Sequence, residues 1–225
     1  KRHFCGHWLS PSDGWRYAAE VIEVAEYIPH PEYTNKTADN DVMLLLLKST
    51  IEDFPVVNLN TNSSQPHVED VVTVMGFGDT TVDDDVFEGS DVLKVAEVFV
   101  QSNEECEESE GNIWGGKLSY DDLVTNKMIC AEAKKFDSCQ ADSAKRHSGK
   151  FNLTLTGGPL VILGKNYTED IQVGIVSWVF GCAHKHFPGI YARVSSYCEW
   201  MCEHVCEKST NAPDSFQCGV SMTSI

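Results

Sequence analysis

One stretch of the chain, residues 137–159, constrains its fold and chemistry most. It begins Asp-Ser-Cys-Gln-Ala-Asp-Ser, which ends at Ser143, and it closes with Gly-Gly-Pro at residues 157–159. Thirteen residues, 144–156, separate the two parts. A serine that acts as a nucleophile must project from a tight turn, beside backbone N–H groups that hold the oxyanion formed on attack. We therefore take Ser143 as the candidate nucleophile.

Length and charge narrow the classes of function. The chain has 225 residues, which is enough for one large β domain or two packed halves. Its 34 acidic and 17 basic residues give a net charge of −17. A chain this acidic is a poor ligand for nucleic acid or for an anionic membrane surface. It contains no run of about 18 apolar residues, and the leucines at 44–47 are predicted to form a short, buried strand.

Cysteine usage and sequons indicate an oxidising compartment. The chain has nine cysteines, a number typical of secreted proteins. Four N-x-Ser/Thr sequons, at Asn35, Asn62, Asn152 and Asn166, favour the same compartment. The chain opens at Lys1 with neither an initiator methionine nor a signal peptide, and we expect it to be cut from something longer. The sequence therefore predicts a secreted glycoprotein.

Without residues 144–156, the stretch around Ser143 resembles the nucleophile loop of trypsin-like serine proteases. The signature of that family is Asp-Ser-Cys-Gln-Gly-Asp-Ser-Gly-Gly-Pro. Further segments resemble the family in the same order, from residue 3 to about residue 201. They are His-Phe-Cys-Gly at 3–6, His-Pro-x-Tyr at 30–33, Asn-Asp-Val-Met-Leu-Leu at 40–45, Met-Ile-Cys-Ala at 128–131, Gly-Ile-Val-Ser-Trp at 174–178 and Pro-Gly-Ile-Tyr-Ala-Arg-Val at 188–194.

The resemblance implies an all-β, chymotrypsin-like fold of two antiparallel β-barrels with the active site in the cleft between them. Residues 1–65 would form a truncated first barrel and residues 66–194 the second. Residues 195–225 would form a C-terminal helix and a cysteine-containing tail, with Ser195 or Ser196 as the N-cap. Segments predicted as strands lie at 21–28, 70–78 and 91–100, and residues 106–130 are predicted as a long loop.

The resemblance also implies a catalytic mechanism. In this family a serine attacks the carbonyl carbon, a histidine takes its proton, and an aspartate fixes the tautomer of the imidazole. Ser143 corresponds to the nucleophile and Asp41 to the aspartate. The backbone N–H groups of Ala141 and Ser143 correspond to the oxyanion hole, although Ala141 replaces the family's glycine. Asp142 corresponds to the carboxylate that pairs with the new N-terminus after zymogen cleavage, an Ile-Val-Gly-Gly sequence that is absent here.

The catalytic histidine has no counterpart in this chain. The family carries it in an Ala-Ala-His-Cys strand, whereas here Ala18-Ala19 continues directly into Glu20. About two dozen residues of the family pattern are missing at this point. His147 lies four residues from Ser143, and we interpret it as a loop histidine of the insert. His184 and His186 are likewise expected to be exposed loop residues rather than metal ligands.

Four residues match the substrate-binding positions of the family. Asp137 corresponds to the floor of the specificity pocket in the trypsin branch, where a buried carboxylate favours Arg or Lys. Gly189 keeps one wall open, while Val179 replaces a glycine and narrows the mouth. Ser177 and the adjacent backbone would bind the substrate main chain as an added strand. We expect protein or peptide substrates, with protease inhibitors as further partners, and neither a cofactor nor a metal.

The resemblance also organises the cysteines. Cys106–Cys130 and Cys139–Cys182 match two disulfides of the family, and Cys5 matches a half-cystine whose partner belongs to the missing segment. Cys198, Cys202, Cys206 and Cys218 are additions whose three pairings stay open. A zinc cluster of Cys198, Cys202 and Cys206 is the alternative to oxidised cysteines, which we expect. The acidic run at residues 83–85 is expected to be a solvated loop rather than a calcium site.

Two functions fit these observations. The first is a secreted serine endopeptidase that cleaves after Arg or Lys and whose sequence here lacks the histidine segment. Ser143, Asp41, Asp137 and Asp142 all persist, although in the family they serve only catalysis and substrate binding. The second is a catalytically inactive homologue that acts as a binding or regulatory module, which the missing histidine favours. The matched motifs exclude an unrelated disulfide-rich β protein.

Overall fold

The fold was analysed in a computed structural model of the chain. The residues that it describes are 2–5, 20–51, 55–77, 92–113, 115–133, 145–147, 150–152, 157–180, 187–209, 212, 216 and 218. They fall into two compact bodies, each described here by itself. The first body comprises Lys1–Pro29, Met43–Phe54 and Ser196–Ile225, and the second comprises His30–Val42 and Pro55–Ser195. The domain boundaries at residues 65 and 194 stay a prediction.

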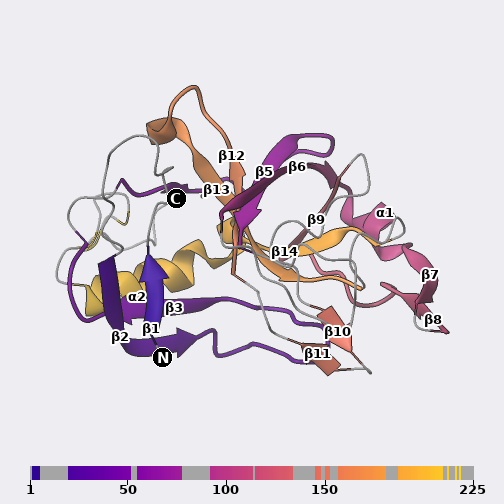
Figure 1. The fold of residues 1–225 in the computed structure, drawn as a ribbon, viewed down its shortest axis with the longest axis horizontal. Coiled ribbons are helices and arrows are strands. Elements are labelled where there is room, and N and C mark those ends of the chain that lie inside the picture. Colours follow the sequence, from indigo (N-terminus) through magenta and orange to yellow (C-terminus); the bar gives the residue numbers. More distant parts are fainter. Residues whose placement is uncertain are drawn as a thin grey trace. The chain divides into compact units, whose positions relative to one another are not determined.

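The second body is built around a closed, antiparallel β-barrel (Figure 1). β12 pairs with β5 along one edge and with β13 along the other, and these two pairings close six strands into a barrel. The two-residue strand β4 (Asn58–Leu59) adds to β13 in parallel. Around the barrel the strands follow in the order β12 (Pro159–Ile162), β5 (Val71–Gly76), β6 (Lys94–Gln101), β9 (Met128–Glu132), β14 (Gly189–Arg193) and β13 (Ile171–Trp178).

Alternating apolar residues fill this barrel. Val72 and Val74 of β5 and Val98 and Val100 of β6 are buried, and each pair is two residues apart, which is the period of one strand face. The strand predictions for residues 70–78 and 91–100 therefore hold. The interior is packed closely enough to require a glycine in β13. A Cβ on Gly174 would lie 3.2 Å from Leu160 Cβ and 3.2 Å from Tyr191 Cβ.

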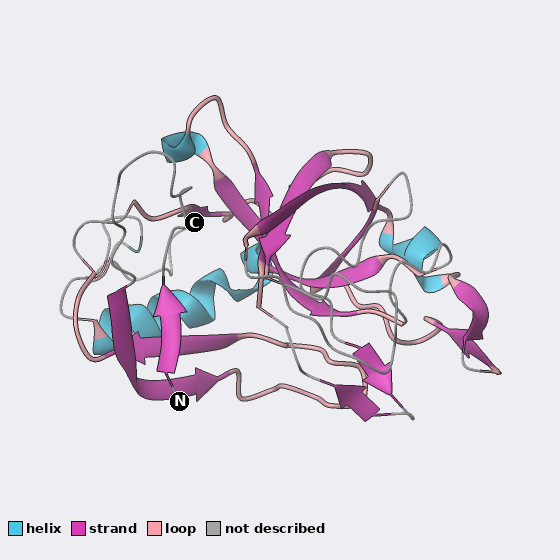
Figure 2. Ribbon diagram, viewed as in Figure 1, coloured by secondary structure: helices cyan, strands magenta, loops and turns pink. Residues whose placement is uncertain are grey.

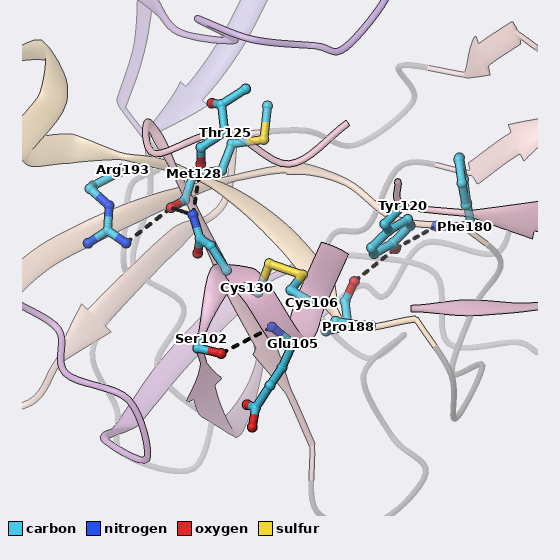
Figure 3. Close-up of a disulfide and its surroundings, with 11 residues drawn as sticks. Ser102, Glu105, Cys106, Tyr120, Thr125, Met128, Cys130, Phe180, Pro188 and Arg193 are labelled. Carbon is cyan, nitrogen blue, oxygen red and sulfur yellow. Dashed lines mark hydrogen bonds between the residues drawn. A yellow bond between two sulfur atoms is a disulfide. The ribbon is translucent and has the colours of Figure 1, made fainter. Parts of the chain in front are cut away.

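A short helix and a hairpin occupy part of the segment that was predicted as a long loop. α1 (Asn103–Glu107) begins where Ser102 Oγ accepts a hydrogen bond from Glu105 N at 3.1 Å (Figure 3). The Ser-x-x-Glu spacing is an N-cap signal that the sequence analysis missed. β7 (Glu110–Ile113) and β8 (Gly116–Ser119) then pair as a hairpin, with Gly115 at φ +78° in its turn. The loop prediction was wrong for these residues.

A disulfide fixes α1 to the barrel. Cys106 and Cys130, the pair that the resemblance implies, are joined in the structure, and both are fully buried (Figure 3). Cys130 lies in β9, so the bridge holds α1 against a barrel strand. Asn103 supports the same junction, because its Nδ2 donates to Thr125 O at 2.8 Å and to Met128 O at 3.2 Å.

The first body combines a small antiparallel sheet with the C-terminal helix (Figures 1 and 2). Its strands follow in the order β1 (Arg2–Cys5), β2 (Glu20–Pro29) and β3 (Met43–Leu47). α2 (Cys198–Lys208) is bound to the sheet by Lys208, whose Nζ lies 3.0 Å from Glu26 Oε2. Both serines lie in the 3₁₀ turn Val194–Tyr197, so the helix begins after them. Its N-cap residue is Tyr197, which makes no side-chain cap bond. The predicted serine N-cap was wrong.

The leucine-rich strand β3 is not a buried core, contrary to expectation. Met43 is 50% exposed and Leu45 40% exposed. Residues 44–47 line a cavity of about 630 Å³ together with His204, Val205 and Lys208 of α2 and with Phe216. The described sheet has three strands and does not close around the leucines as a complete barrel would. Among the described residues, the first body thus holds only this three-stranded sheet, in keeping with the truncated first barrel that the resemblance implies.

Among the described residues, no helix is both long enough and apolar enough to cross a membrane.

Because the barrel is closely packed, a leucine within β12 and one just after it should contribute very differently to the stability of the second body. Leu160 is fully buried, whereas Leu163 is 55% exposed. Leu160→Ala should lower the free energy of unfolding of the second body by about 2–5 kcal/mol, because it leaves a cavity. Leu163→Ala is the matched control and should change it by less than about 0.5 kcal/mol. Urea unfolding followed by tryptophan fluorescence measures both, and equal losses would mean that the barrel core is not packed as described.

Candidate active site

Asp41 lies in a turn whose backbone is fixed within the second body. The preceding residue, Asn40, is buried and has φ 58°, a left-handed conformation that asparagine adopts more readily than most residues. Val42 N donates to Asn40 O at 2.8 Å, and His30 N donates to Val42 O at 3.0 Å. These bonds hold the backbone on both sides of Asp41.

Side chains anchor the same turn to the segment that leads into β9. Lys127 Nζ donates to Asn40 Oδ1 at 2.7 Å, and Thr125 Oγ1 donates to Asp39 Oδ1 at 2.8 Å. Both residues that precede Asp41 are therefore bound to one short stretch of the second body. No local sequence pattern predicts this anchor, because its partners are more than 80 residues apart.

The carboxylate of Asp41 is bound by a buried serine of the barrel. Ser177 Oγ donates to Asp41 Oδ2 at 2.7 Å, and Ser177 is buried near the end of β13. Burial raises the pKa of Asp41 above the usual aspartate value, and the hydrogen bond from Ser177 lowers it in part. The pKa of Tyr33 is raised mainly by burial and further by the charge of Asp41, so its phenol interacts electrostatically with this carboxylate. The structure thus brings together Asp41 and Ser177, which are 136 residues apart.

The other predicted catalytic residues lie outside the described residues. These are Ser143, Ala141, Asp142 and Asp137, and the cysteines 139 and 182 of the second implied disulfide also belong to this group. The same is true of His184, His186 and the acidic run at residues 83–85. Within the insert, β10 (Lys145–His147) and β11 (Lys150–Asn152) form a short antiparallel hairpin. His147 therefore ends a strand.

An aromatic cluster includes the residues next to two predicted substrate-binding positions, Ser177 and Val179. Trp178, Phe180 and Phe187 pack around Tyr120, with ring centroids 4.9–5.0 Å from that of Tyr120. Tyr120 Oη donates to Pro188 O at 2.9 Å and accepts from Phe180 N at 3.2 Å (Figure 3). The tyrosine therefore holds residues 178–180 and 187–188 together. The sequence analysis missed Tyr120, because its role depends on a carbonyl 68 residues away.

Val179 and Gly189 are both closely packed against neighbouring side chains. Val179 is 6% exposed and is part of the aromatic cluster. A Cβ on Gly189 would lie 3.1 Å from Tyr191 Oη, so close packing against a buried phenol requires a small residue there. Both residues thus have structural reasons for their identity, and their roles in substrate binding stay predictions.

In the described part of the chain, one group of three side chains of the types that bind metal ions lies close together. Glu107, Asp121 and Asp122 place one ligand atom each within 4.8 Å of one another near α1. The two aspartates are exposed. Acidic groups of this kind are common on protein surfaces without any ion, so this cluster does not identify a metal site.

The bond between Asp41 and Ser177 predicts a pH-dependent effect of Ser177→Ala. Removing the hydroxyl should raise the pKa of Asp41 further. A carboxyl whose pKa is higher in the folded than in the unfolded state favours folding less as the pH rises. The variant should therefore lose little stability below the ordinary aspartate pKa of about 3.9. At neutral pH the unsatisfied carboxylate should cost about 1–3 kcal/mol.

Urea unfolding of the unmodified chain and of Ser177→Ala, from below the ordinary aspartate pKa to neutral pH, measures the loss of stability. Asp41→Asn supplies the control, because Ser177→Ala in that background should show no such pH dependence. A loss of stability that is the same at acidic and neutral pH would show that the serine does not support the charged carboxylate.

Comparisons with known proteins identify the family of this chain. The trypsin family model matches residues 5–201. Trypsin 5G1 of Aedes aegypti is 33% identical over 189 residues, which cover 82% of this chain and 60% of that protein. Trypsin-3 of Homo sapiens is 31% identical over 194 residues, or 84% of this chain and 53% of that protein. The chain thus spans between half and two thirds of the length of these relatives.

A solved structure shares the fold. Neuropsin, a serine protease expressed in the limbic system of mouse brain, superposes with a TM-score of 0.60 at 26% identity. The match covers 83% of this chain and 73% of that one. The family model, the relatives and the closed barrel agree, and the chain belongs to the trypsin family.

Proposed function

We propose that this chain represents a secreted serine endopeptidase that hydrolyses peptide bonds after Arg or Lys. In this proposal Ser143 is the nucleophile and Asp41 orients a histidine. The histidine belongs to a strand that the present sequence lacks between Ala19 and Glu20. The proposal rests above all on the hydrogen bond from Ser177 to Asp41.

That bond gives Asp41 the properties that an orienting carboxylate needs. Such a group must be charged, partly shielded from water, and fixed so that one oxygen faces the imidazole. Burial shields Asp41, and Ser177 holds its Oδ2 while favouring the charged form. Oδ1 is then the oxygen to which an imidazole Nδ1–H would donate. The anchored turn keeps this arrangement without any contribution from a histidine.

The resemblance to the family supplies the proposed chemistry. With a histidine in place, Ser143 Oγ attacks the carbonyl carbon while the imidazole takes its proton and later passes it to the leaving amine. Asp41 stabilises the imidazolium that forms between these steps. The N–H groups of Ala141 and Ser143 would bind the oxyanion, and Asp142 would pair with the new N-terminus. The resemblance supplies the roles of these three residues.

The proposed specificity rests on the cleft residues. Asp137 would bind the cationic end of an Arg or Lys side chain through a charge-assisted hydrogen bond. Ser177 is the penultimate residue of the barrel strand β13, and we expect its backbone to bind a substrate as an added strand. Val179 adds a side chain where the trypsin branch has a glycine, and we expect Val179→Gly to improve the preference for Arg and Lys.

A catalytically inactive homologue is the second candidate. The missing histidine favours it, and so does the hairpin of β10 and β11, which lies within the insert directly after Ser143. Such a protein would bind peptides or protease inhibitors without cleaving them. Both candidates fit an extracellular location, because two disulfides occur among the described residues and sequon residues Asn35, Asn62 and Asn166 are exposed.

Labelling with a fluorophosphonate separates the two candidates. The chain as it stands should not label, because without a general base Ser143 keeps its proton and is a poor nucleophile. Loss of one triad member costs about 10⁴–10⁶ in turnover in enzymes of this mechanism. A repaired chain should label and should cleave arginyl or lysyl amides. The repair restores the Ala-Ala-His-Cys strand, deletes residues 144–156 and adds a cleavable Ile-Val-Gly-Gly start.

Two variants of the repaired chain serve as controls. Ser143→Ala should abolish labelling, and Asp41→Asn should reduce turnover about 10⁴-fold. A repaired chain that folds but neither labels nor cleaves would favour the inactive homologue. Strong labelling of the unrepaired chain, abolished by Ser143→Ala, would show that another base acts in the site and would contradict the proposed role of the missing histidine.

A further inference from the structure

Three cysteines of α2 share one face of the helix. Cys198, Cys202 and Cys206 follow one another at intervals of four residues, and side chains four residues apart are neighbours on a helix. Each interval advances about 6 Å along the axis. Cys198 and Cys206 are therefore about 12 Å apart along the helix, too far for both to bind one zinc ion through Zn–S bonds of about 2.3 Å. In this structure Cys206 is instead bonded to Cys218 of the tail.

The thiol of Cys202 lies beside that bridge. Its Sγ donates to the carbonyl oxygen of Phe216 at 2.9 Å. Cys206 Sγ, which has no proton in the disulfide, lies 3.7 Å from the same oxygen. Two cysteine sulfurs one helical turn apart thus face one carbonyl group, two residues before Cys218. The tail that carries Cys218 therefore passes within reach of both.

We propose that the tail disulfide is exchangeable, with Cys218 bonded either to Cys206 or to Cys202. In the exchange, the thiolate of Cys202 attacks Sγ of Cys218 and forms a new S–S bond, while the Cys206–Cys218 bond breaks. Cys206 leaves as a thiolate and takes up the proton that Cys202 lost. No electrons are gained or lost overall, so the step needs no oxidant or reductant.

Cys198 is not the second partner in this exchange. Cys198 lies one helical turn before Cys202 and about two turns before Cys206, so Cys202 stands between it and the bridge. Burial raises the pKa of its thiol above the ordinary cysteine value, so its thiolate forms less readily than that of an exposed cysteine. Its place on the helix leaves Cys202 as the nearer partner.

The exchange would change the cavity of the first body. Phe216 lines that cavity together with Lys208 and Ser209, at the C-terminal end of α2. Transfer of Cys218 from Cys206 to Cys202 moves the attachment point of the tail by about 6 Å towards the start of the helix. Phe216 would be drawn away from Lys208 and Ser209, and the apolar surface of β3 would become more accessible.

Peptide mapping of the intact chain without reduction tests the exchange. Free thiols are alkylated, and a glutamyl endopeptidase cleaves after Glu203, which separates Cys202 from Cys206. After incubation with a trace of reduced glutathione, the wild-type chain should yield peptides with both bridges. Cys206→Ser should shift all bridged Cys218 to Cys202. Cys202→Ser should lose the second bridge entirely, and Cys198→Ser should match the wild type.

Two results would overturn the proposal. The first is a Cys206→Ser chain that folds with Cys218 alkylated as a thiol or bonded to Cys198, because either finding would show that Cys202 does not reach Cys218. A second measurement uses the fluorescence of anilinonaphthalene sulfonate, which binds exposed apolar surface. It should be higher for Cys206→Ser than for Cys202→Ser, and equal fluorescence would refute the coupling to the cavity.

Discussion

The double pairing of β12 is the constraint on which the rest of the second body depends. By bonding to β5 and to β13, this strand closes the barrel and leaves no open edge between them. Closure buries the valine and leucine side chains of the interior and fixes β13, whose Ser177 binds Asp41. The polar contact at the candidate site is therefore supported by apolar packing elsewhere in the barrel.

This arrangement explains how Asp41 can keep its position without a contribution from the first body. Every described support of Asp41 comes from the second body: Ser177 on the carboxylate, and Lys127 and Thr125 on the residues before it. In the first body, Leu45 of β3 is exposed and the strand lines a cavity with α2. The proposed disulfide exchange involves this body alone, whereas the proposed catalysis also needs a histidine from a strand after Ala19 and so involves both bodies.

Local patterns predicted much of the barrel, because alternation of β-branched residues is a property of each strand by itself. The order of the motifs also placed Asp41 ahead of Ser177, although not their contact. Predictions failed where the outcome depends on distant partners. Burial of residues 44–47 required strands that the described part of the sheet does not contain, and the role of Tyr120 required a carbonyl from another loop. The pairing of Cys206 with Cys218, rather than of another helix cysteine, followed from no local pattern.

The segment His30–Val42, which carries Asp41, belongs to the same body as the barrel, and we expect it to be stabilised with the barrel rather than with the sheet whose strands precede and follow it. Amide hydrogen exchange on the intact chain tests it most directly. The amide of His30, bonded to Val42 O, should exchange about as slowly as that of Val176, bonded to Gly158 O in the barrel. The amide of Lys48, bonded to Glu23 O in the first body, should exchange at least about tenfold faster. Exchange of His30 at the rate of Lys48, with Val176 alone protected, would contradict the account.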